Sequence, residues 1–486
     1  MTIRLGAIAD ALRDAGLLTK TTGTLPAQAA AITEDSRAIT RGSIFVAVRG
    51  TAGDGHDFLP AAASAGAVAA IVEDAALAEL PSLVVNDSRA AAAVAAAVAY
   101  GHPARELRLV AVTGTNGKTT TTALLRAVLD EESAPSASVG TLGVLVGAGG
   151  EPSPGGGGLT TPGPVELQRV LRALAGAGVR TVAMEVSSHS LDQRRVNGLE
   201  FAAAVFTNFT RDHLDYHRTM EAYFLAKAKL ISYLAPGGVV VVNADDPAWE
   251  ALPPAPRKFS FGRRGDLRVS SLIGHSFAGA EFDLTCEGVP HRVELPLVGE
   301  FNVENAAAAA AAALQLGVPL RVVAARLSSA PQVPGRLEIL ARDPAIIRDY
   351  AHTPDALKRL LSALKPMCAG RLIVVFGCGG DRDKGKRPLM GAIASAQADV
   401  AIVTSDNPRT EDPESIIDDV VAGMTAGGYE RIEDRRAAIE RAIELADPRD
   451  VVVVAGKGHE TYQIRGTTHF PFDEKEIVSE ILAPSR

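Results

Sequence analysis

The sequence is poor in several features that define common classes of protein. Only three of its 486 residues are cysteines, Cys286, Cys368 and Cys378, and they show neither metal-ligand spacing nor an even number for pairing. This excludes a fold built on disulfides and suits a reducing compartment. The formal net charge is −8, so there is no excess of positive charge to attract nucleic acid. Any anionic ligand must be held by local groups.

Long apolar runs are missing as well. The first residues, M-T-I-R-L-G, lack the apolar core of a signal peptide. Two alanine-rich stretches, 90–99 and 306–314, are too short and too weakly apolar to span a bilayer, so close helix packing explains them better. We therefore expect a cytoplasmic protein without membrane insertion or a nucleic-acid partner, and we expect a monomer.

The features that are present indicate a large globular α/β protein. Hydrophobic residues make up 47% and charged residues 22%, which is ordinary for a chain with a full core. The length predicts about three domains. We place these domains at 1–107, 108–330 and 331–486. The first boundary follows H-P-A at 102–104, which breaks the pattern of strands and helices, and the second lies in the proline-rich joint 328–336.

Apolar runs of strand length alternate with helical patterns, which predicts parallel sheets covered by helices. The glycine-rich stretch 147–158 reads as a mobile loop or hairpin tip without a chemical role. The predicted strands are 43–48, 181–186, 203–207, 239–242, 372–376, 400–404 and 451–455.

A phosphate-binding loop is the strongest local signal. The apolar run 109–112 leads into T-G-T-N-G-K-T-T-T at 113–121, and a helical pattern follows to Leu129. Glycines let backbone amides close on an anion, Lys118 can reach phosphates, and Thr119 can ligate Mg²⁺. The loop is shorter than a Walker A loop, whose first glycine would fall on Val112.

Three further positions carry possible chemistry. Glu185 ends a buried strand, where a carboxylate needs a metal or a partner; a helix cap or an arginine pair is the alternative. His213 lies among acidic residues in R-D-H-L-D-Y-H and could equally be a surface residue. The next helix carries Lys227 and Lys229, and composition alone favours solvated lysines at both positions.

Several characteristic segments follow one another along nearly the whole chain. They are G-T-N-G-K-T-T, E-V-S-S-H-S-L, R-D-H-L-D-Y-H, G-E-F-N-V-E-N-A, V-P-G-R-L-E, D-Y-A-H-T-P-D-A-L and G-C-G-G-D-R-D-K-G-K-R-P. Together these segments resemble the Mur ligases of peptidoglycan synthesis. Departures from the family pattern are small: Phe209-Thr210 stands where Leu-Ser is usual, and the stretch 147–158 is unusually rich in glycine.

The resemblance implies an N-terminal α/β uridine-binding domain, a central ATPase domain on a parallel sheet with the phosphate loop, and a C-terminal Rossmann-like domain. It implies ATP and Mg²⁺ as cofactors, with Lys227 carbamylated by CO₂ so that it can help to hold a metal. Lys118, Lys227, His213 and Glu185 would be catalytic, and Thr119, Glu185, His213 and the Lys227 carbamate would hold metal. The ATP contacts would be Gly114, Thr115, Asn116, Gly117, Lys118, Thr119, Thr120, Asn305, Arg336 and Asp349.

The same resemblance implies a UDP-N-acetylmuramoyl dipeptide as one substrate, lying across the first two domains. For individual positions a turn hydroxyl or a solvated arginine is the simpler alternative. The implied contacts are Ser36, Thr51, Ala52, Gly53, Asn116, Thr160, Thr161, Ser187, Gln193 and Arg195.

The last domain offers a pocket for an amino acid. Three loops, 379–383, 405–409 and 455–460, follow three strands, and ligands of open parallel sheets bind at the carboxyl ends of strands. Cations at Arg382 and Arg409 and anions at Asp406 and Glu460 suit a zwitterion. By resemblance, D-N-P-R at 406–409 is the form of this segment found in ligases that select meso-diaminopimelate. The resemblance adds Asn407, Pro408 and Gly456 to the expected contacts with that amino acid.

The expected activity is therefore ATP-dependent amide formation through an acyl phosphate on the D-glutamate side chain of the sugar dipeptide. A lysine-adding Mur ligase and a ligase like folylpolyglutamate synthetase are the alternatives within the fold. A nucleotide-binding regulator without turnover is the alternative from another class, and it predicts damaged metal positions.

Overall fold

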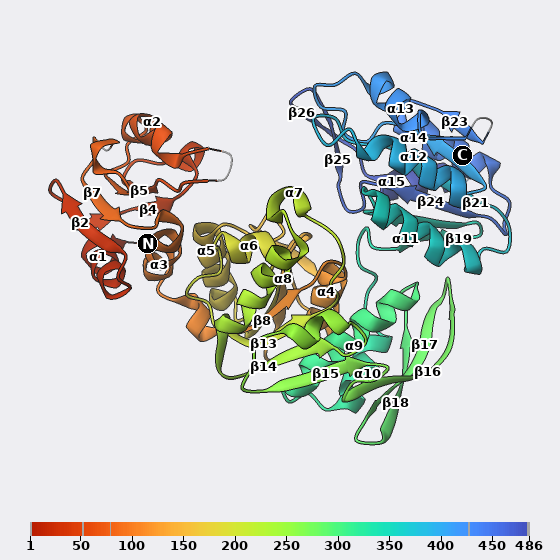
Figure 1. Cartoon of the computed structure of the whole chain (residues 1–486), viewed down its shortest axis with the longest axis horizontal. Helices are drawn as coiled ribbons and strands as arrows, with labels where there is room; N and C mark the ends of the chain where they lie inside the picture. The colour runs from red at the N-terminus through yellow and green to blue at the C-terminus, as the bar shows by residue number, and fades with distance from the viewer. Residues whose placement is uncertain (1, 51–52, 78, 426–427, 484–486) are drawn as a thin grey trace. The chain divides into compact units, whose positions relative to one another are not determined.

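The structure is a computed structural model, and it describes residues 2–50, 53–77, 79–425 and 428–483. Figure 1 shows the helices and strands coloured along the sequence. The chain forms two compact units. The first comprises Met1–Ser270, Leu284–His291 and Glu304–Ala330, and the second comprises Ser271–Asp283, Arg292–Val303 and Pro331–Arg486. Among the described residues, no helix is long and apolar enough to cross a membrane.

The first unit begins with a five-stranded sheet, ordered β2-β7-β6-β5-β4, which is parallel except for its β2 edge. Alanines of helix α3 are buried against this sheet and α1, and small side chains permit that close approach. The strands are β2 (Leu18–Thr22), β4 (Ala31–Thr33), β5 (Ser43–Val46), β6 (Ala69–Val72) and β7 (Ser82–Val85); the helices are α1 (Leu5–Asp14), α2 (Leu59–Ser64) and α3 (Ser88–Ala99); and β1 (Ile3–Arg4) pairs with β3 (Gln28–Ala29).

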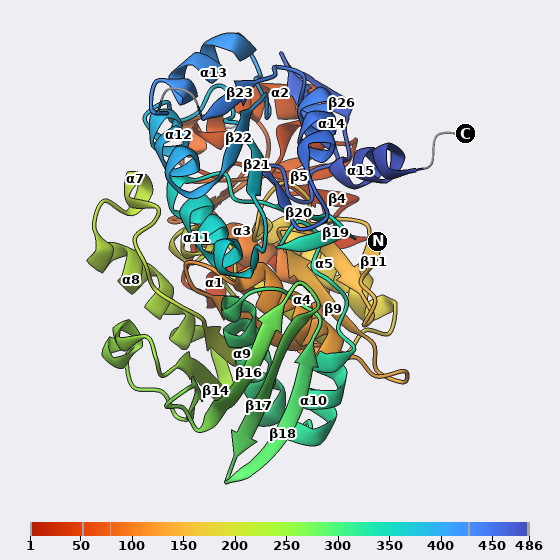
Figure 2. The same cartoon turned by 90° about the vertical axis from the view of Figure 1, so that its right-hand side faces the viewer.

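A second, larger sheet has the order β11-β10-β9-β12-β8-β13-β14-β15-β16-β17-β18. Strands β9 to β16 in this order are parallel, and the β9-β10-β11 edge is antiparallel. Figure 2 shows β16, β17 and β18 side by side. The bounds are β8 (Arg108–Thr113), β9 (Ser136–Gly140), β10 (Gly143–Val146), β11 (Glu151–Ser153), β12 (Thr181–Glu185), β13 (Phe201–Phe206), β14 (Leu234–Asn243), β15 (Lys258–Gly262), β16 (Leu267–Ser276), β17 (Gly279–Cys286) and β18 (Val289–Leu295).

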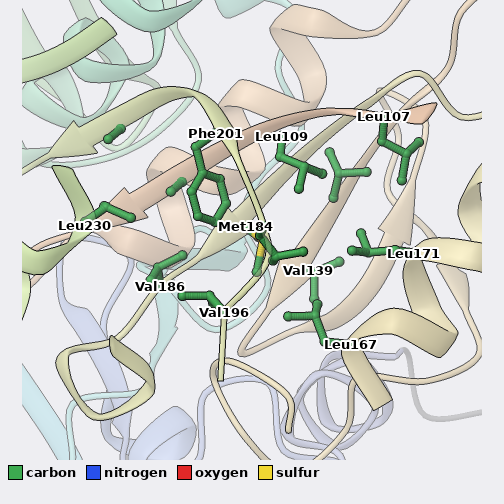
Figure 3. Close-up of a cluster of buried hydrophobic side chains, with 14 of the residues drawn as sticks. Leu107, Leu109, Val139, Leu167, Leu171, Met184, Val186, Val196, Phe201 and Leu230 are labelled. Atoms are coloured by element: carbon green, nitrogen blue, oxygen red, sulfur yellow. The ribbon is translucent and has the colours of Figure 1, made fainter. Parts of the chain in front are cut away.

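Helices cover this sheet because its central strands are apolar on both faces. One of the resulting cores includes Leu109, Met184 and Phe201 from adjacent strands and Leu171 from α5 (Figure 3). The helices are α4 (Lys118–Leu129), α5 (Pro164–Gly176), α6 (Ser188–Asp192), α7 (Leu214–His217), α8 (Met220–Ala228), α9 (Glu300–Gln315) and α10 (Leu320–Ser328).

The second unit contains a six-stranded sheet ordered β19-β20-β24-β21-β22-β23, antiparallel only at β19. Alternate residues of β21 enter opposite cores, Val374 and Phe376 on one face and Ile373 and Val375 on the other. The strands are β19 (Glu338–Arg342), β20 (Ala345–Asp349), β21 (Leu372–Phe376), β22 (Val400–Val403), β23 (Tyr429–Arg431) and β24 (Val451–Ala455), and the helices are α11 (Pro354–Leu364), α12 (Lys386–Gln397), α13 (Pro413–Val421), α14 (Arg435–Leu445) and α15 (Glu474–Leu482).

The structure confirms the α/β class with parallel sheets, and each predicted strand overlaps an observed one. The alternation of strands and helices predicts only a loop between the strand 451–455 and the helix after it, and this expectation is wrong. Strand β24 is followed by a hairpin, β25 (Tyr462–Arg465) and β26 (Thr468–Pro471), before helix α15 begins. Gly466, with a φ of 61°, makes the turn that the sequence reading missed. The glycine-rich stretch does include a hairpin tip, between β10 and β11.

Candidate active site

The predicted phosphate loop joins the end of β8 to the start of α4. Gly114 and Gly117 have φ angles of 149° and 82°, which favour glycine. A Cβ at Gly114 would lie 1.9 Å from the Thr207 Oγ1, and one at Gly117 would lie 2.2 Å from the Asn305 Oδ1. The loop therefore requires glycine at both positions. Asn305, one of the expected ATP contacts, lies beside this loop and accepts a hydrogen bond from the Thr121 Oγ1 at 3.4 Å.

Lys118 folds back over the loop. Its Nζ donates to the carbonyl oxygens of Gly114 and Thr115 at 3.0 and 2.9 Å. Asn116 donates its backbone amide to the Asn208 Oδ1 at 2.9 Å, while its side-chain Nδ2 is buried without a partner in the described part of the chain. Thr120 is buried in the first turn of α4. Loop amides, a lysine and a helix N-terminus are thus gathered at one point, as anion binding requires.

Glu185 lies at the end of β12, next to β8, with only 2% of its surface exposed. Its oxygens accept from neutral groups: the Thr119 Oγ1 at 3.1 Å, the Thr141 backbone N–H at 2.8 Å and the Thr141 Oγ1 at 3.2 Å. These contacts differ from the helix cap or arginine pair considered as alternatives. A buried carboxylate beside a threonine hydroxyl is a donor set that suits Mg²⁺.

Lys227, in α8, and Lys229, the residue that follows the last residue of this helix, differ sharply in environment. Lys227 is 1% exposed, and its Nζ donates to the Gly114 carbonyl at 2.7 Å and lies 4.5 Å from the centroid of the Tyr223 ring. Burial, and then the nearby charge of Lys118, lower the pKa of Lys227 well below its ordinary value. Lys229 is 49% exposed and pairs with Asp192 at 2.9 Å. Composition alone suggests the wrong environment for Lys227.

His213 stands at the start of α7 with a φ of 53°. Its ring lies edge-on to those of His189 and Tyr223, at centroid distances of 4.8 and 5.9 Å. Burial lowers the pKa of His213; the charge of Asp212 opposes this shift, and the charge of Lys118 adds to it. These shifts favour a neutral imidazole, the form that ligates metal.

No group of three His, Cys, Asp or Glu side chains within the described residues is arranged to hold a metal ion. The residues that fit Mg²⁺ are the Thr119 hydroxyl and the Glu185 carboxylate, which already contact each other. Thr141 was not predicted, although it follows β9 at the same edge of the sheet, the signal that could have revealed it.

Residues predicted to contact the sugar peptide form one connected group beside Glu185. Thr161 donates its Oγ1 to the Glu185 carbonyl at 2.8 Å and accepts from the Ser187 backbone N–H at 3.2 Å. Arg195 donates to the Thr161 carbonyl at 2.9 Å and to the Gln193 Oε1 at 3.1 and 2.6 Å. Thr160 accepts from the Thr141 Oγ1 at 3.3 Å.

The predicted uridine contacts lie in loops of the N-terminal sheet. Ser36 opens the 3-10 helix η1 (Ser36–Ala38), whose N-cap is Asp35. The carbonyl of Gly53 accepts from the Gly50 backbone N–H at 2.9 Å. The predicted contacts Thr51 and Ala52 lie outside the residues that the structure describes.

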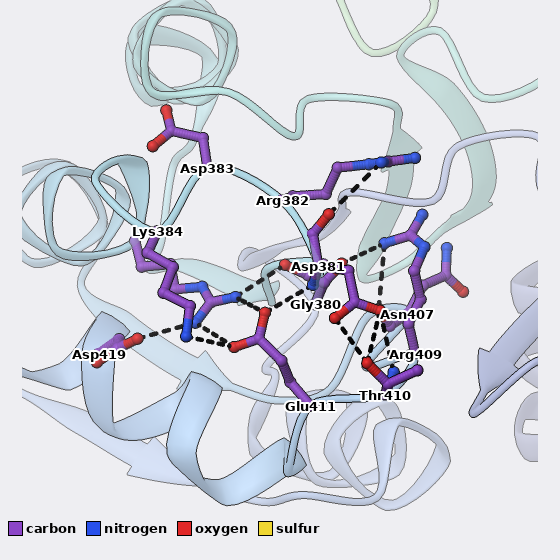
Figure 4. Close-up of polar contacts among 12 residues, drawn as sticks. Gly380, Asp381, Arg382, Asp383, Lys384, Asn407, Arg409, Thr410, Glu411 and Asp419 are labelled. Atoms are coloured by element: carbon purple, nitrogen blue, oxygen red, sulfur yellow. Dashed lines mark hydrogen bonds and ion pairs between the residues drawn. The ribbon is translucent and has the colours of Figure 1, made fainter. Parts of the chain in front are cut away.

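In the second unit, two of the three predicted loops are tied directly through Arg409. Its Nη1 donates to the Gly380 carbonyl at 2.8 Å and to the Asn407 carbonyl at 3.4 Å (Figure 4). Arg382 is exposed and has a weaker contact, 3.5 Å to the Asp381 carbonyl. Pro408 is buried between Asn407 and Arg409. Both guanidinium groups therefore belong to one loop cluster.

The third loop joins the cluster through Glu460. Its Oε2 accepts from the Asn407 Nδ2 at 2.9 Å and from the Lys457 Nζ at 3.3 Å. Lys457, which the sequence reading did not single out, is fully buried and also donates to the Asn407 Oδ1 at 3.0 Å. The Asp406 Oδ2 is buried without a partner in the described chain, and a Cβ at Gly456 would lie 2.6 Å from it.

Arg336 and Asp349, predicted to reach ATP, lie near each other in the second unit. The Arg336 guanidinium stacks 4.8 Å from the centroid of the Tyr350 ring. Asp349 is buried, and its oxygens accept from the backbone N–H groups of Leu337 and Ala351 at 2.8 and 2.9 Å. Burial raises the pKa of Asp349, while the charge of Arg336 opposes that rise.

A glycine-bounded phosphate loop beside a buried carboxylate, on a helix-covered parallel sheet, defines a nucleotide-binding α/β protein of the phosphate-loop class. Comparison with known families narrows this class. Residues 29–112 match the model for the Mur ligase family, catalytic domain; residues 112–313 match the Mur ligase middle domain; and residues 335–458 match the Mur ligase, glutamate ligase domain. The chain belongs to the Mur ligase family.

Individual relatives agree over nearly the whole length. UDP-N-acetylmuramoyl-L-alanyl-D-glutamate–2,6-diaminopimelate ligase of Gloeobacter violaceus is 45% identical and covers 94% of each chain. The ligase of the same name from Synechococcus elongatus is 45% identical, over 92% of this chain and 93% of that one. A solved structure with that name is 37% identical, with a TM-score of 0.63 over 93% of this chain and 94% of its own.

Proposed function

We propose that the chain is an ATP-dependent, ADP-forming ligase of peptidoglycan synthesis. It adds meso-2,6-diaminopimelate to the γ-carboxylate of D-glutamate in UDP-N-acetylmuramoyl-L-alanyl-D-glutamate. The observation that carries the proposal is the direct contact between the phosphate loop and a buried carboxylate, the Thr119 Oγ1 to the Glu185 Oε2 at 3.1 Å. The relatives that carry this name, 45% identical over more than nine-tenths of the chain, support the choice of substrates.

The chemistry follows from the poor reactivity of a carboxylate toward an amine. A glutamate oxygen attacks the γ-phosphorus of ATP, so that ADP leaves and an acyl phosphate forms. The amine of the incoming amino acid then attacks the acyl carbon, and inorganic phosphate leaves as the amide forms. Lys118 is placed to bind the phosphates once its contacts to the loop carbonyls are exchanged for them.

Magnesium would supply charge neutralisation on the transferring phosphates. Thr119, Glu185, His213 and a carbamate on Lys227 would hold it. That carbamate forms when the neutral Lys227 amine adds to CO₂ and releases one proton. The buried position and the lowered pKa of Lys227 favour the neutral amine that this step needs.

The remaining assignments rest on the family resemblance and stay predictions. They include the ATP contacts of Asn305, Arg336 and Asp349 and the domain limits 1–107, 108–330 and 331–486. The sugar peptide is assigned to the connected group around Thr161 and Arg195. We place the reaction in the cytoplasm, where ATP and a nucleotide-linked sugar are both at hand.

Arg409 is the proposed selector of diaminopimelate over lysine. Diaminopimelate carries one more carboxylate on its far carbon, and a guanidinium can bind both oxygens of that group. Such a pair contributes about 1.5 to 3 kcal/mol, which is roughly tenfold to over a hundredfold in binding. Lysine would leave the guanidinium without a carboxylate partner, which enlarges the ratio. Glu460 would hold the far ammonium, which both amino acids share.

The deciding experiment measures kcat/KM for diaminopimelate and for lysine in wild type, Arg409→Ala and Glu460→Gln. We expect Arg409→Ala to reduce the preference for diaminopimelate strongly and Glu460→Gln to impair both amines alike. An unchanged preference in Arg409→Ala would show that another group selects the amino acid. Omitting the UDP-sugar dipeptide tests the folylpolyglutamate-type alternative, and a lack of ATP turnover with all substrates present would favour a regulator.

A further inference from the structure

Glu411 lies just beyond the predicted amino-acid contacts and binds two cations. Its side chain is 18% exposed. The Oε1 accepts from the Arg387 Nη2 at 2.9 Å, and the Oε2 accepts from the Arg387 Nη1 at 3.1 Å. The Oε2 also pairs with the Lys384 Nζ at 3.0 Å (Figure 4). The hydrogen bonds from Arg387, followed by those from the Asp381 amide and Lys384, lower the pKa of Glu411 to about 2. The carboxylate is thus charged at any working pH.

The same carboxylate is linked to Arg409 through a single peptide group. Glu411 Oε1 accepts the backbone N–H of Asp381 at 2.6 Å. The carbonyl of that peptide group belongs to Gly380, and it accepts from the Arg409 Nη1 at 2.8 Å. A carboxylate on the N–H side polarises the peptide, which makes its carbonyl a better acceptor for the guanidinium.

A reciprocal contact joins the same two loops. The Asp381 carboxylate accepts from the Thr410 Oγ1 at 2.8 and 3.0 Å and from the Thr410 backbone N–H at 3.2 Å. Asp381 and Arg409 have φ angles of 52° and 53°, a region that side chains adopt at a cost and that surrounding contacts must maintain. A Cβ at Gly380 would lie 1.8 Å from the Pro408 carbonyl oxygen, so the loops are in close backbone contact.

We propose that Glu411 is a positioning residue for recognition of the amino-acid substrate. It fixes the Gly380–Asp381 peptide group, and through that group it sets the direction of the Arg409 guanidinium. Glu411 itself is assigned no contact with the substrate. The inference rests on the proposed function, in which Arg409 binds the far carboxylate of diaminopimelate.

The test uses the full-length enzyme with ATP and the UDP-sugar dipeptide at saturation, and measures kcat and the KM for diaminopimelate. The variants are Glu411→Ala, Glu411→Gln, Arg409→Ala and the double variant Arg409→Ala/Glu411→Gln. Glu414→Gln is the matched control, because Glu414 lies in the next helix, is 55% exposed and pairs with Arg431. If Glu411→Ala does not fold, Glu411→Gln, which keeps the shape and one acceptor, carries the test.

We expect Glu411→Ala to raise the KM for diaminopimelate roughly tenfold, the effect of losing a charge-assisted hydrogen bond. Glu411→Gln should raise it less, while kcat and the KM for ATP stay within about twofold of wild type. In the Arg409→Ala background, Glu411→Gln should add almost nothing, since its effect passes through Arg409.

Three results would overturn the positioning role: no change of KM in Glu411→Gln, an equal further rise in the Arg409→Ala background, or a parallel loss of ATP affinity. A normal KM for diaminopimelate in Arg409→Ala would instead refute the selector assignment in the proposed function. The positioning role would fall with it. Failure of Glu411 alone, with the Arg409→Ala effect intact, leaves the proposed function standing.

Discussion

Replacing Lys227 by methionine would separate the chemical role of this residue from its packing role. The Lys227 amine is buried against the Gly114 carbonyl at 2.7 Å and the Tyr223 ring at 4.5 Å. Methionine keeps most of the aliphatic stem and removes the amine, so that no carbamate can form. We therefore expect a folded protein that has lost its activity.

The loss of stability and the loss of catalytic rate in Lys227→Met have separate causes. The Gly114 carbonyl still accepts from the Lys118 Nζ at 3.0 Å in the variant, so losing the Lys227 hydrogen bond should cost about 1 kcal/mol of unfolding free energy. Removing the burial cost of the amine offsets part of this loss. A missing metal-binding carboxylate removes several kcal/mol of transition-state stabilisation, and about 4 kcal/mol corresponds to roughly a thousandfold in kcat.

The assay is phosphate release that requires both substrates, together with thermal unfolding and carbon-13 NMR after incubation with labelled bicarbonate. Wild type should show a carbamate signal that Lys227→Met lacks, and a short carboxylic acid should partly restore Lys227→Ala. Lys229→Met is the matched control, because Lys229 is exposed and pairs only at the surface with Asp192. Near-normal turnover in Lys227→Met, or an equal loss in Lys229→Met, would refute the reasoning.

Further predictions concern Lys118, Gly114 and Glu34. Lys118→Ala should slow single-turnover phosphate transfer by several orders of magnitude without changing the circular dichroism spectrum; a normal rate would contradict its role at the phosphates. Gly114→Ala places a Cβ 1.9 Å from the Thr207 Oγ1, so ATP should no longer protect it from thermal unfolding. Burial raises the pKa of Glu34 to about 7 from its ordinary 4.5, so wild type loses stability as pH rises between these values. Glu34→Gln should therefore stabilise the protein by up to about 3 kcal/mol at pH 8 and by little near pH 4.5. Urea unfolding at the two pH values measures this difference, and an equal gain in stability at both would contradict the prediction.

The sequence alone was enough to predict the phosphate loop, the α/β class and the buried strands. These features are local: glycines with positive φ at 114 and 117, a lysine at the start of α4, and apolar runs such as β21 and β24 whose both faces are buried. The backbone conformation of a glycine turn and the spacing of apolar residues depend on a few neighbouring residues, so both can be predicted from a single sequence. The hairpin β25-β26 was missed because its turn signal, Gly466, stands among polar residues without a strong apolar pattern.

Only the tertiary structure distinguished Lys227 from Lys229. They are only two residues apart, Lys227 in α8 and Lys229 at its C-cap, yet Lys227 is buried beside the phosphate loop and Lys229 is exposed to solvent. Glu411 and Lys457 are also recognisable only in the structure, because their partners Asp381 and Asn407 lie 30 and 50 positions away in the sequence. Thr141 contacts Glu185, 44 positions away, and its place after β9 is the only sequence signal for this contact. Burial and long-range hydrogen bonds depend on which strands become neighbours, and that is decided by the packing of the whole sheet rather than by any short stretch of sequence.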